Sequence, residues 1–308
     1  MLNKIIEGQS KFRIILLCFL ILLTYQASAQ NLDTLKHRIN QILASKKAVV
    51  GISIIGNDGK DTLSLNGDRH FPLQSVFKFH IALAMLSKID KRQFSLSQKV
   101  RITKNELLPD LWSPLREENP NGGMFQISTL IQYAVSQSDN VACDALLRLI
   151  GGPKVVEEYM KNNNIKDIAI KLNEEDIQKK WDLMFENWTT PKAACEVLKK
   201  FYNNKNKLLS EKSYGFIWKT MKETQTGEER IRGLLPKNAI VAHKTGSSGT
   251  NKEGITEAVN DIGIVFLPNG KYFIISAFVS SSKESNETNE KIIAEITKVT
   301  YDYYKGSL

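Results

Sequence analysis

Apolar residues follow a helical spacing just after residue 30 and a strand spacing directly afterwards. The helical spacing, three or four residues apart, is seen at Leu32, Leu35, Ile39, Ile42 and Leu43. Residues 48–56 (AVVGISIIG) and 61–67 (DTLSLNG) then have strand character and flank an Asn-Asp-Gly turn. The pattern predicts a helix followed by two strands.

The rest of the chain changes from helical to extended patterns. Residues 71–219 read as helices and loops, clearest in STLIQYAVSQSDNVACDALLRLIGG, and we expect no strands there. Strand character returns in residues 239–246, 260–267 and 271–279, the last two joined by a Pro-Asn-Gly turn. A last helix carries one apolar stripe, formed by Ile292, Ile296, Val299 and Tyr303.

Strands at both ends with helices between them predict an α/β (α+β) fold. Both chain ends would form one antiparallel sheet with flanking helices, and an all-α domain would be inserted between them. We expect the α/β domain to comprise residues 30–68 and 220–308 and the all-α domain residues 69–219. A cleft between two such domains is a natural place for a site.

Residues 1–29 have the pattern of a secretory signal peptide. Lys11 and Arg13 precede the apolar run IILLCFLILL, and Ala27-Ser28-Ala29 precedes Gln30. The apolar run is short for a membrane span, so we expect a secreted, periplasmic protein that begins near Gln30 and has no membrane segment. A retained anchor is the alternative.

Composition bears on three questions: disulfides, nucleic-acid binding and metal binding. Only Cys143 and Cys195 follow the leader, and we expect two buried thiols, although one disulfide stays possible. The net charge of +9 falls to about +7 without the leader, whose net charge is +2. The excess is dispersed, which argues against nucleic-acid binding. The four histidines lack metal-ligand spacing, so we expect no metal.

The stretch FPLQSVFKFH, residues 71–80, places Ser75 and Lys78 among apolar residues. Its proline disfavours helix, so a helix is expected to begin near Gln74 or Ser75 and to run to Leu86. The i, i+3 spacing then puts serine and lysine on one face. Burial disfavours a charged lysine, which makes Lys78 a candidate base for the serine. The alternative is a surface lysine that snorkels from a core helix.

Two further tripeptides carry polar groups at the ends of predicted elements. SDN, residues 138–140, lies between two helical runs, where capping alone would explain it. KTG, residues 244–246, ends an apolar strand, where a cation, a hydroxyl and a glycine could bind a carboxylate and an acylated substrate. The alternative is an edge-strand lysine that deters aggregation.

SxxK, SDN and KTG in this order are typical of penicillin-recognising serine enzymes. With QSVFK, SDNVACD and AHKTG, the chain after residue 30 resembles a class A serine β-lactamase, most like the extended-spectrum PER and VEB branch. The resemblance implies Ser75 as nucleophile, Lys78 as its proton-accepting partner and Ser138 as proton relay to the lactam nitrogen. Asn140 would bind the substrate amide, and the backbone N–H groups of Ser75 and Ser247 would form the oxyanion hole.

The resemblance also implies how the substrate is bound. Lys244, Thr245 and Ser247 would hold its carboxylate, and Arg230 matches a position where some members supply a second cation. A solvated surface arginine is the alternative. Trp112 falls at the aromatic of the cleft mouth, with a core tryptophan as the alternative.

Hydrolysis of the acylated serine needs a base that activates water. Glu174 lies 36 residues beyond Ser138, the family's spacing for its catalytic glutamate, and Gln178 would help to position the water. Read without the resemblance, residues 174–176 are a solvated acidic cluster. Whether the lysine or the glutamate accepts the proton during acylation is disputed for these enzymes.

Three positions depart from the commoner family pattern. Leu172 and Asn187 stand where an arginine and an aspartate usually tie the loop ends, and Asp144 replaces an asparagine, as in the PER branch. We therefore expect a rearranged or looser loop and a wider cleft that admits oxyimino cephalosporins.

The function implied is hydrolysis of penicillins and cephalosporins by a cofactor-free, monomeric enzyme that confers antibiotic resistance. A low-molecular-weight penicillin-binding protein, a D,D-peptidase, would share the serine, the lysines and the fold but would need no base in the loop. A β-lactam sensor domain, which is acylated without turnover, is the second alternative.

Overall fold

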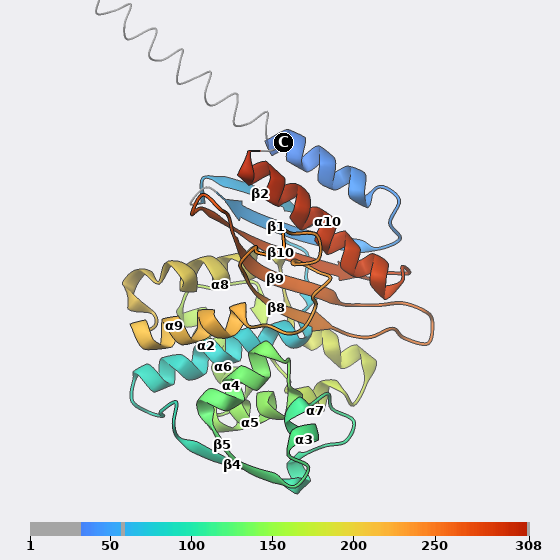
Figure 1. Cartoon of the computed structure of the whole chain (residues 1–308). Coiled ribbons are helices and arrows are strands. Elements are labelled where there is room, and N and C mark those ends of the chain that lie inside the picture. Colours follow the sequence, from blue (N-terminus) through green and yellow to red (C-terminus); the bar gives the residue numbers. More distant parts are fainter. Residues whose placement is uncertain (1–31, 57–58, 307–308) are drawn as a thin grey trace, which may run out of the picture.

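A five-stranded antiparallel sheet forms the centre of the computed structural model, which describes residues 32–56 and 59–306 (Figure 1). Its order is β2-β1-β10-β9-β8, with the strands β1 (Val49–Gly56), β2 (Asp61–Leu65), β8 (Val241–Ser247), β9 (Val259–Phe266) and β10 (Tyr272–Ser280). Strand β1 pairs with β10, placing Ile54 opposite Ile275. The prediction that both chain ends join in one sheet is therefore confirmed.

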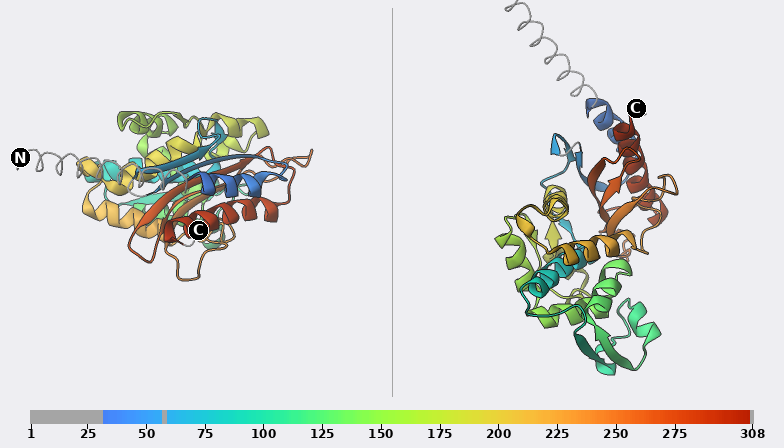
Figure 2. Two further views of the ribbon diagram at one scale, coloured as in Figure 1. Left: turned by 90° about the horizontal axis from the view of Figure 1, so that it is seen from above. Right: turned by 60° about the vertical axis from the view of Figure 1, so that its left-hand side comes forward.

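Two helices cover the outer face of this sheet. The helix of residues 32–43 and α10 (Asn286–Lys305) lie next to each other there (Figures 1 and 2). Alternate residues of β1, such as Ile52 and Ile54, pack with Ile292 and Ile296 in one apolar cluster. Every second residue of the strand thus packs with the apolar stripe of the helix, whose residues repeat every 3.6 positions. The predicted apolar stripe of the last helix is confirmed at these two residues, which are fully buried.

The inner face of the sheet packs against the helical part of the chain. This part contains α2 (Phe77–Asp90), α4 (Ile127–Ser136), α5 (Asn140–Ile150), α6 (Pro153–Asn162), α8 (Pro191–Asn203) and α9 (Glu211–Lys222), together with the short α3 (Pro114–Glu118) and α7 (Glu174–Ile177). Every side chain of α2 from Phe77 to Ser87 is buried. A helix that is apolar all round belongs in a core, so α2 becomes the central helix and Lys78 is buried with it.

The expectation of no strands in residues 71–219 is wrong. Strands β4 (Lys99–Thr103) and β5 (Gly122–Gln126) form a hairpin, and β3 (Phe71–Pro72), β7 (Trp188–Thr189) and β6 (Ile168–Ala169) form a small sheet. The two-residue strands are too short to give a periodic signal. The segment KVRIT of β4 does alternate, and Ile102 is its buried residue.

The two cysteines of the described chain are free and buried. Cys195 donates its thiol to the carbonyl of Ser53 at 3.2 Å. The prediction of buried thiols is confirmed, and no disulfide joins them. No helix within residues 32–56 and 59–306 is long and apolar enough to cross a membrane. The leader predicted for residues 1–29 lies outside the described residues.

Candidate active site

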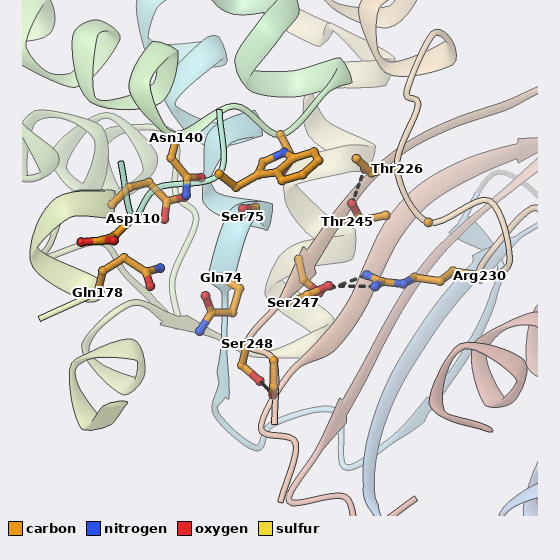
Figure 3. A pocket seen from close by; sticks show the side chains of 16 residues that line it. Gln74, Ser75, Asp110, Asn140, Gln178, Thr226, Arg230, Thr245, Ser247 and Ser248 are labelled. Carbon is orange, nitrogen blue, oxygen red and sulfur yellow. Dashed lines mark hydrogen bonds between the residues drawn. The ribbon is translucent and has the colours of Figure 1, made fainter. Parts of the chain in front are cut away.

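A cavity of about 370 Å³ opens between strand β8 and the helical part of the chain (Figure 3). Nine of the eleven residues proposed from the sequence line it: Ser75, Trp112, Ser138, Asn140, Glu174, Gln178, Arg230, Thr245 and Ser247. The other two, Lys78 and Lys244, have no exposed surface and lie directly behind the lining residues, as their contacts with Ser75 and Ser138 place them. The structure therefore brings the whole predicted set together.

Lys78 is the centre of the hydrogen-bond network. Its Nζ lies 2.8 Å from Ser75 Oγ, 2.8 Å from the Ser138 carbonyl oxygen and 2.5 Å from Asn140 Oδ1. Glu174 Oε1 lies 2.8 Å from the same nitrogen. A snorkelling surface lysine is therefore excluded, and the buried ammonium has polar partners on every side, as a buried charge requires.

The position of Ser75 follows from the start of α2. The serine sits in a 3₁₀ turn, Gln74–Val76, that leads directly into the helix, which puts Ser75 and Lys78 on one face as predicted. Gln74 has a φ of 45°, a left-handed conformation that costs a non-glycine residue energy. Such strain is typical of functional turns.

The three residues of the SDN turn differ in role: Asp139 is structural, whereas Ser138 and Asn140 belong to the site. Asp139 caps α5 by accepting the N–H of Ala142 at 2.8 Å, and it also accepts the N–H of Leu115 at 2.8 Å. Burial raises the pKa of Asp139. Ser138 has a φ of 60°, and both it and Asn140 face the cavity. Capping explains only the middle residue of the motif.

Strand β8 forms the opposite wall of the cavity. The Nζ of Lys244 donates to Ser138 Oγ at 3.0 Å, and burial lowers the pKa of Lys244 well below its usual range. A side chain at Gly246 would place its Cβ 2.7 Å from the Leu73 carbonyl oxygen and 3.2 Å from the Ser75 nitrogen. The strand therefore approaches the serine turn backbone to backbone.

Arg230 is buried at the end of this wall. Its guanidinium donates to the carbonyls of Gly246 at 3.1 Å and Asn260 at 2.9 Å and to Ser247 Oγ at 2.8 Å. Its Nε lies 3.1 Å from Glu290 Oε1. The alternative of a solvated surface arginine is wrong, because only 6% of this residue is exposed.

Glu174 begins the short helix α7, lines the cavity and is 3% exposed. The carboxylate of Asp144 accepts the N–H groups of Glu174 at 2.8 Å and Glu175 at 3.0 Å. Burial raises the pKa of Asp144 to about 6. The solvated reading of the acidic cluster is wrong for Glu174, which faces Lys78.

A neutral clamp, the side-chain amide of Asn187, ties the two ends of this loop. Its oxygen accepts the N–H groups of Lys171 at 2.7 Å and Leu172 at 3.0 Å, and its nitrogen donates to the Leu172 carbonyl at 2.9 Å. Asn187 has no exposed surface. The charged pair is absent, as expected, but the loop ends are not loose.

Trp112 lies at the cavity mouth with 58% of its surface exposed, and its Nε1 donates to the Gln137 carbonyl at 3.1 Å. The alternative of a core tryptophan is wrong. Sequence reasoning missed several lining residues: Gln74, Asp110, Thr226, Gly227, Ser248 and Gly249. Gln74, Asp110, Ser248 and Gly249 lie within two positions of a predicted site residue, and this closeness along the chain is the signal that could have found them.

A serine, two buried lysines and a buried glutamate around one cleft are the parts that a serine acyl-transfer enzyme requires. The model of the beta-lactamase enzyme family matches residues 34–304. The chain is 51% identical to beta-lactamase VEB-1 of Pseudomonas aeruginosa over 292 residues, covering 95% of this chain and 97% of that protein. It is 41% identical to extended-spectrum beta-lactamase PER-1 of the same organism, covering 91% and 90%.

A solved structure gives the same assignment. The TLA-1 extended-spectrum beta-lactamase superposes with a TM-score of 0.86 at 48% identity, covering 89% of this chain and 99% of that one. The protein described here therefore belongs to the beta-lactamase enzyme family. The class A branch proposed from the sequence motifs is confirmed by these relatives.

Proposed function

We propose that the protein hydrolyses the amide bond of β-lactams through an acyl-enzyme on Ser75. One observation carries the proposal: the Nζ of Lys78 lies 2.8 Å from both Ser75 Oγ and Glu174 Oε1. A nucleophile and two proton-accepting groups thus form one chain of contacts. Acylation and deacylation can both use it.

In acylation, Ser75 Oγ attacks the lactam carbonyl carbon and loses its proton either to Lys78, after the lysine has passed one of its own protons to Glu174, or through water to Glu174. The backbone N–H groups of Ser75 and Ser247 would stabilise the oxyanion. When the C–N bond breaks, Ser138 gives its proton to the lactam nitrogen and regains one from the lysines beside it. The contact of Lys244 with Ser138 Oγ at 3.0 Å supports this route.

In deacylation, Glu174 takes a proton from a water molecule, and the hydroxide attacks the ester carbon on Ser75. The ester bond breaks, and Ser75 Oγ takes up a proton from Lys78, which regains one from Glu174. Gln178, at the end of α7, lines the same part of the cavity and would hold the water. Lys244, Thr245, Ser247 and Arg230 would bind the substrate carboxylate, and Asn140 its side-chain amide.

We also propose that oxyimino cephalosporins are substrates. The relatives PER-1 and TLA-1 are named extended-spectrum beta-lactamases, and Trp112 is exposed at the cavity mouth. Purified protein should hydrolyse cefotaxime and ceftazidime as well as benzylpenicillin. Turnover of benzylpenicillin alone would refute the wider range.

Glu174→Gln tests the proposed function. The native protein should turn over a chromogenic cephalosporin at catalytic concentration, whereas the variant should stop at the acyl-enzyme. Mass spectrometry of the variant after mixing with benzylpenicillin should show the mass of protein plus drug persisting for hours. A D,D-peptidase or a sensor domain would show that stable adduct in the native protein and no change on substitution.

The mature chain is proposed to act as a periplasmic monomer. Support comes from the leader pattern of residues 1–29. The N-terminal sequence of protein recovered from the periplasm should begin near Gln30, and light scattering should give the mass of one chain. Retention in the membrane fraction or a dimer mass would contradict this.

A further inference from the structure

Three charged side chains line the cavity, and only one of them has no partner. Glu174 is paired with Lys78, and Arg230 with Glu290. Asp110 is exposed and has no hydrogen bond or ion pair to any residue in the described part of the chain. In Figure 3 it lies across the cavity from Arg230. Among the described lining residues, Asp110 therefore carries the one uncompensated charge, a negative one on its side of the cavity.

The backbone around Asp110 is fixed. The guanidinium of Arg116 donates to the carbonyls of Leu108 at 2.5 Å, Pro109 at 2.9 Å and Leu111 at 2.7 Å. The carbonyl of Trp112 accepts the N–H of Asn140 at 3.0 Å. One arginine thus fixes residues 108–111 and the SDN turn fixes Trp112, so Asp110 is presented at the rim on a rigid segment.

Substrate orientation decides which group meets this carboxylate. The carboxylate of a bound β-lactam would be drawn to the wall that carries Arg230, with Lys244 behind it. The acyl side chain on the other side of the lactam carbonyl then extends toward Asn140 and the rim with Asp110. A positive charge on that side chain is attracted, whereas a neutral one gains nothing.

We propose that Asp110 is a specificity-determining residue that favours β-lactams whose acyl side chain carries an ammonium group. The inference rests on the proposed function and concerns the substrate class of the same site. The carboxylate is exposed, so its effect is that of a surface ion pair, about two- to five-fold in kcat/KM.

The test compares ampicillin with benzylpenicillin, which differ by one ammonium group on the acyl side chain. The ratio of kcat/KM for ampicillin to that for benzylpenicillin should fall about two- to five-fold in Asp110→Asn at low salt. The fall should shrink in 0.5 M salt, because ions screen exposed charges within a few ångströms. Asp110→Glu keeps the charge and should retain most of the ratio.

Asp33→Asn is the matched control, because it removes the same charge from an exposed position on the helix of residues 32–43, at the far side of the sheet (Figure 1). Its ratio should equal that of the native protein. An unchanged ratio in Asp110→Asn, or an equal loss for both drugs, would overturn the assignment. If the native protein hydrolysed neither drug, the proposed function itself would fail, which is a distinct result.

Discussion

The carboxylate of Glu174 lies 2.8 Å from the ammonium of Lys78, and the two side chains are 3% and 0% exposed. Removing two charges from water costs several kcal/mol for each ion, and the pair recovers this only while both members are present. Removing one member of this pair alone should therefore destabilise the folded state.

Lys78→Met should be strongly destabilised, because it leaves the buried Glu174 carboxylate without its cation. We expect the free energy of unfolding to fall by about 3–5 kcal/mol. The double variant Lys78→Met with Glu174→Gln should regain a large part of that loss and remain inactive. Urea unfolding at neutral pH measures the free energy of unfolding of both variants. Lys154→Met, which opens an exposed pair with Glu158, is the control and should cost about 1 kcal/mol or less. Equal stabilities of the single and double variants would contradict the pairing.

The Asn187 clamp should not tolerate a carboxylate. Asn187→Asp keeps the oxygen that accepts from residues 171 and 172 but turns a second oxygen toward the Leu172 carbonyl, where the native amide donates. We expect a loss of about 1–3 kcal/mol in the free energy of unfolding, the cost of an unsatisfied buried group. Amide hydrogen exchange at residues 171–172 should also accelerate. The exposed Asn238→Asp adds the same charge, and a similar loss there would point to net charge instead.

Stability should fall as the pH rises through the titration of Asp144. Burial raises its folded pKa to about 6 from the ordinary 3.8. Between these values the folded state holds a proton that the unfolded state has released, so unfolding is progressively favoured from about pH 4 to 6. The contribution is roughly 3 kcal/mol.

Asp144→Asn lacks this titration. Chemical unfolding in a pH series should show the native protein losing stability relative to the variant between about pH 4 and 6, with a constant difference above pH 7. Parallel curves over the whole range would show that the carboxyl does not titrate differently in the folded state.

The two thiols should be inert in the native protein. Burial raises the pKa of Cys195 to about 11 and raises that of Cys143 as well, and the thiolate is the reactive form. Ellman's reagent at pH 8 should therefore detect no thiol in folded protein of residues 30–308. Two thiols should react after unfolding in guanidinium. Fewer than two in the unfolded sample would mean that a disulfide had formed.

Much of the fold was predictable because its signals are long. The strands of the sheet extend over several residue pairs, and the apolar stripe from Ile292 to Tyr303 extends over about three helical turns. Both faces of the sheet are buried. The short strands β3, β6 and β7 carry two residues each, which depend on tertiary pairing rather than on local preference.

The site residues that belong to a sequence motif could be predicted. Residues outside the motifs, such as Arg230 and Asn187, were harder to interpret. The order of the three motifs led to Ser75 and Lys78, and the resemblance to class A β-lactamases, with its spacing from Ser138, led to Glu174; the structure brings the three into contact. The burial of Arg230 was left open, because its partners come from β8, β9 and α10. The amide of Asn187 was read as a missing charge, although it supplies both a donor and an acceptor.

The close approach at Gly246 limits how this protein can change under drug selection. Any side chain there would press on the Leu73 carbonyl and the Ser75 amide, so a substitution at Gly246 would also displace the nucleophile. Gly249, two residues beyond Ser247, has no atom within 4 Å of an added Cβ, but its φ of 73° disfavours any other residue there, so adaptation to a bulkier antibiotic is expected at the facing rim instead.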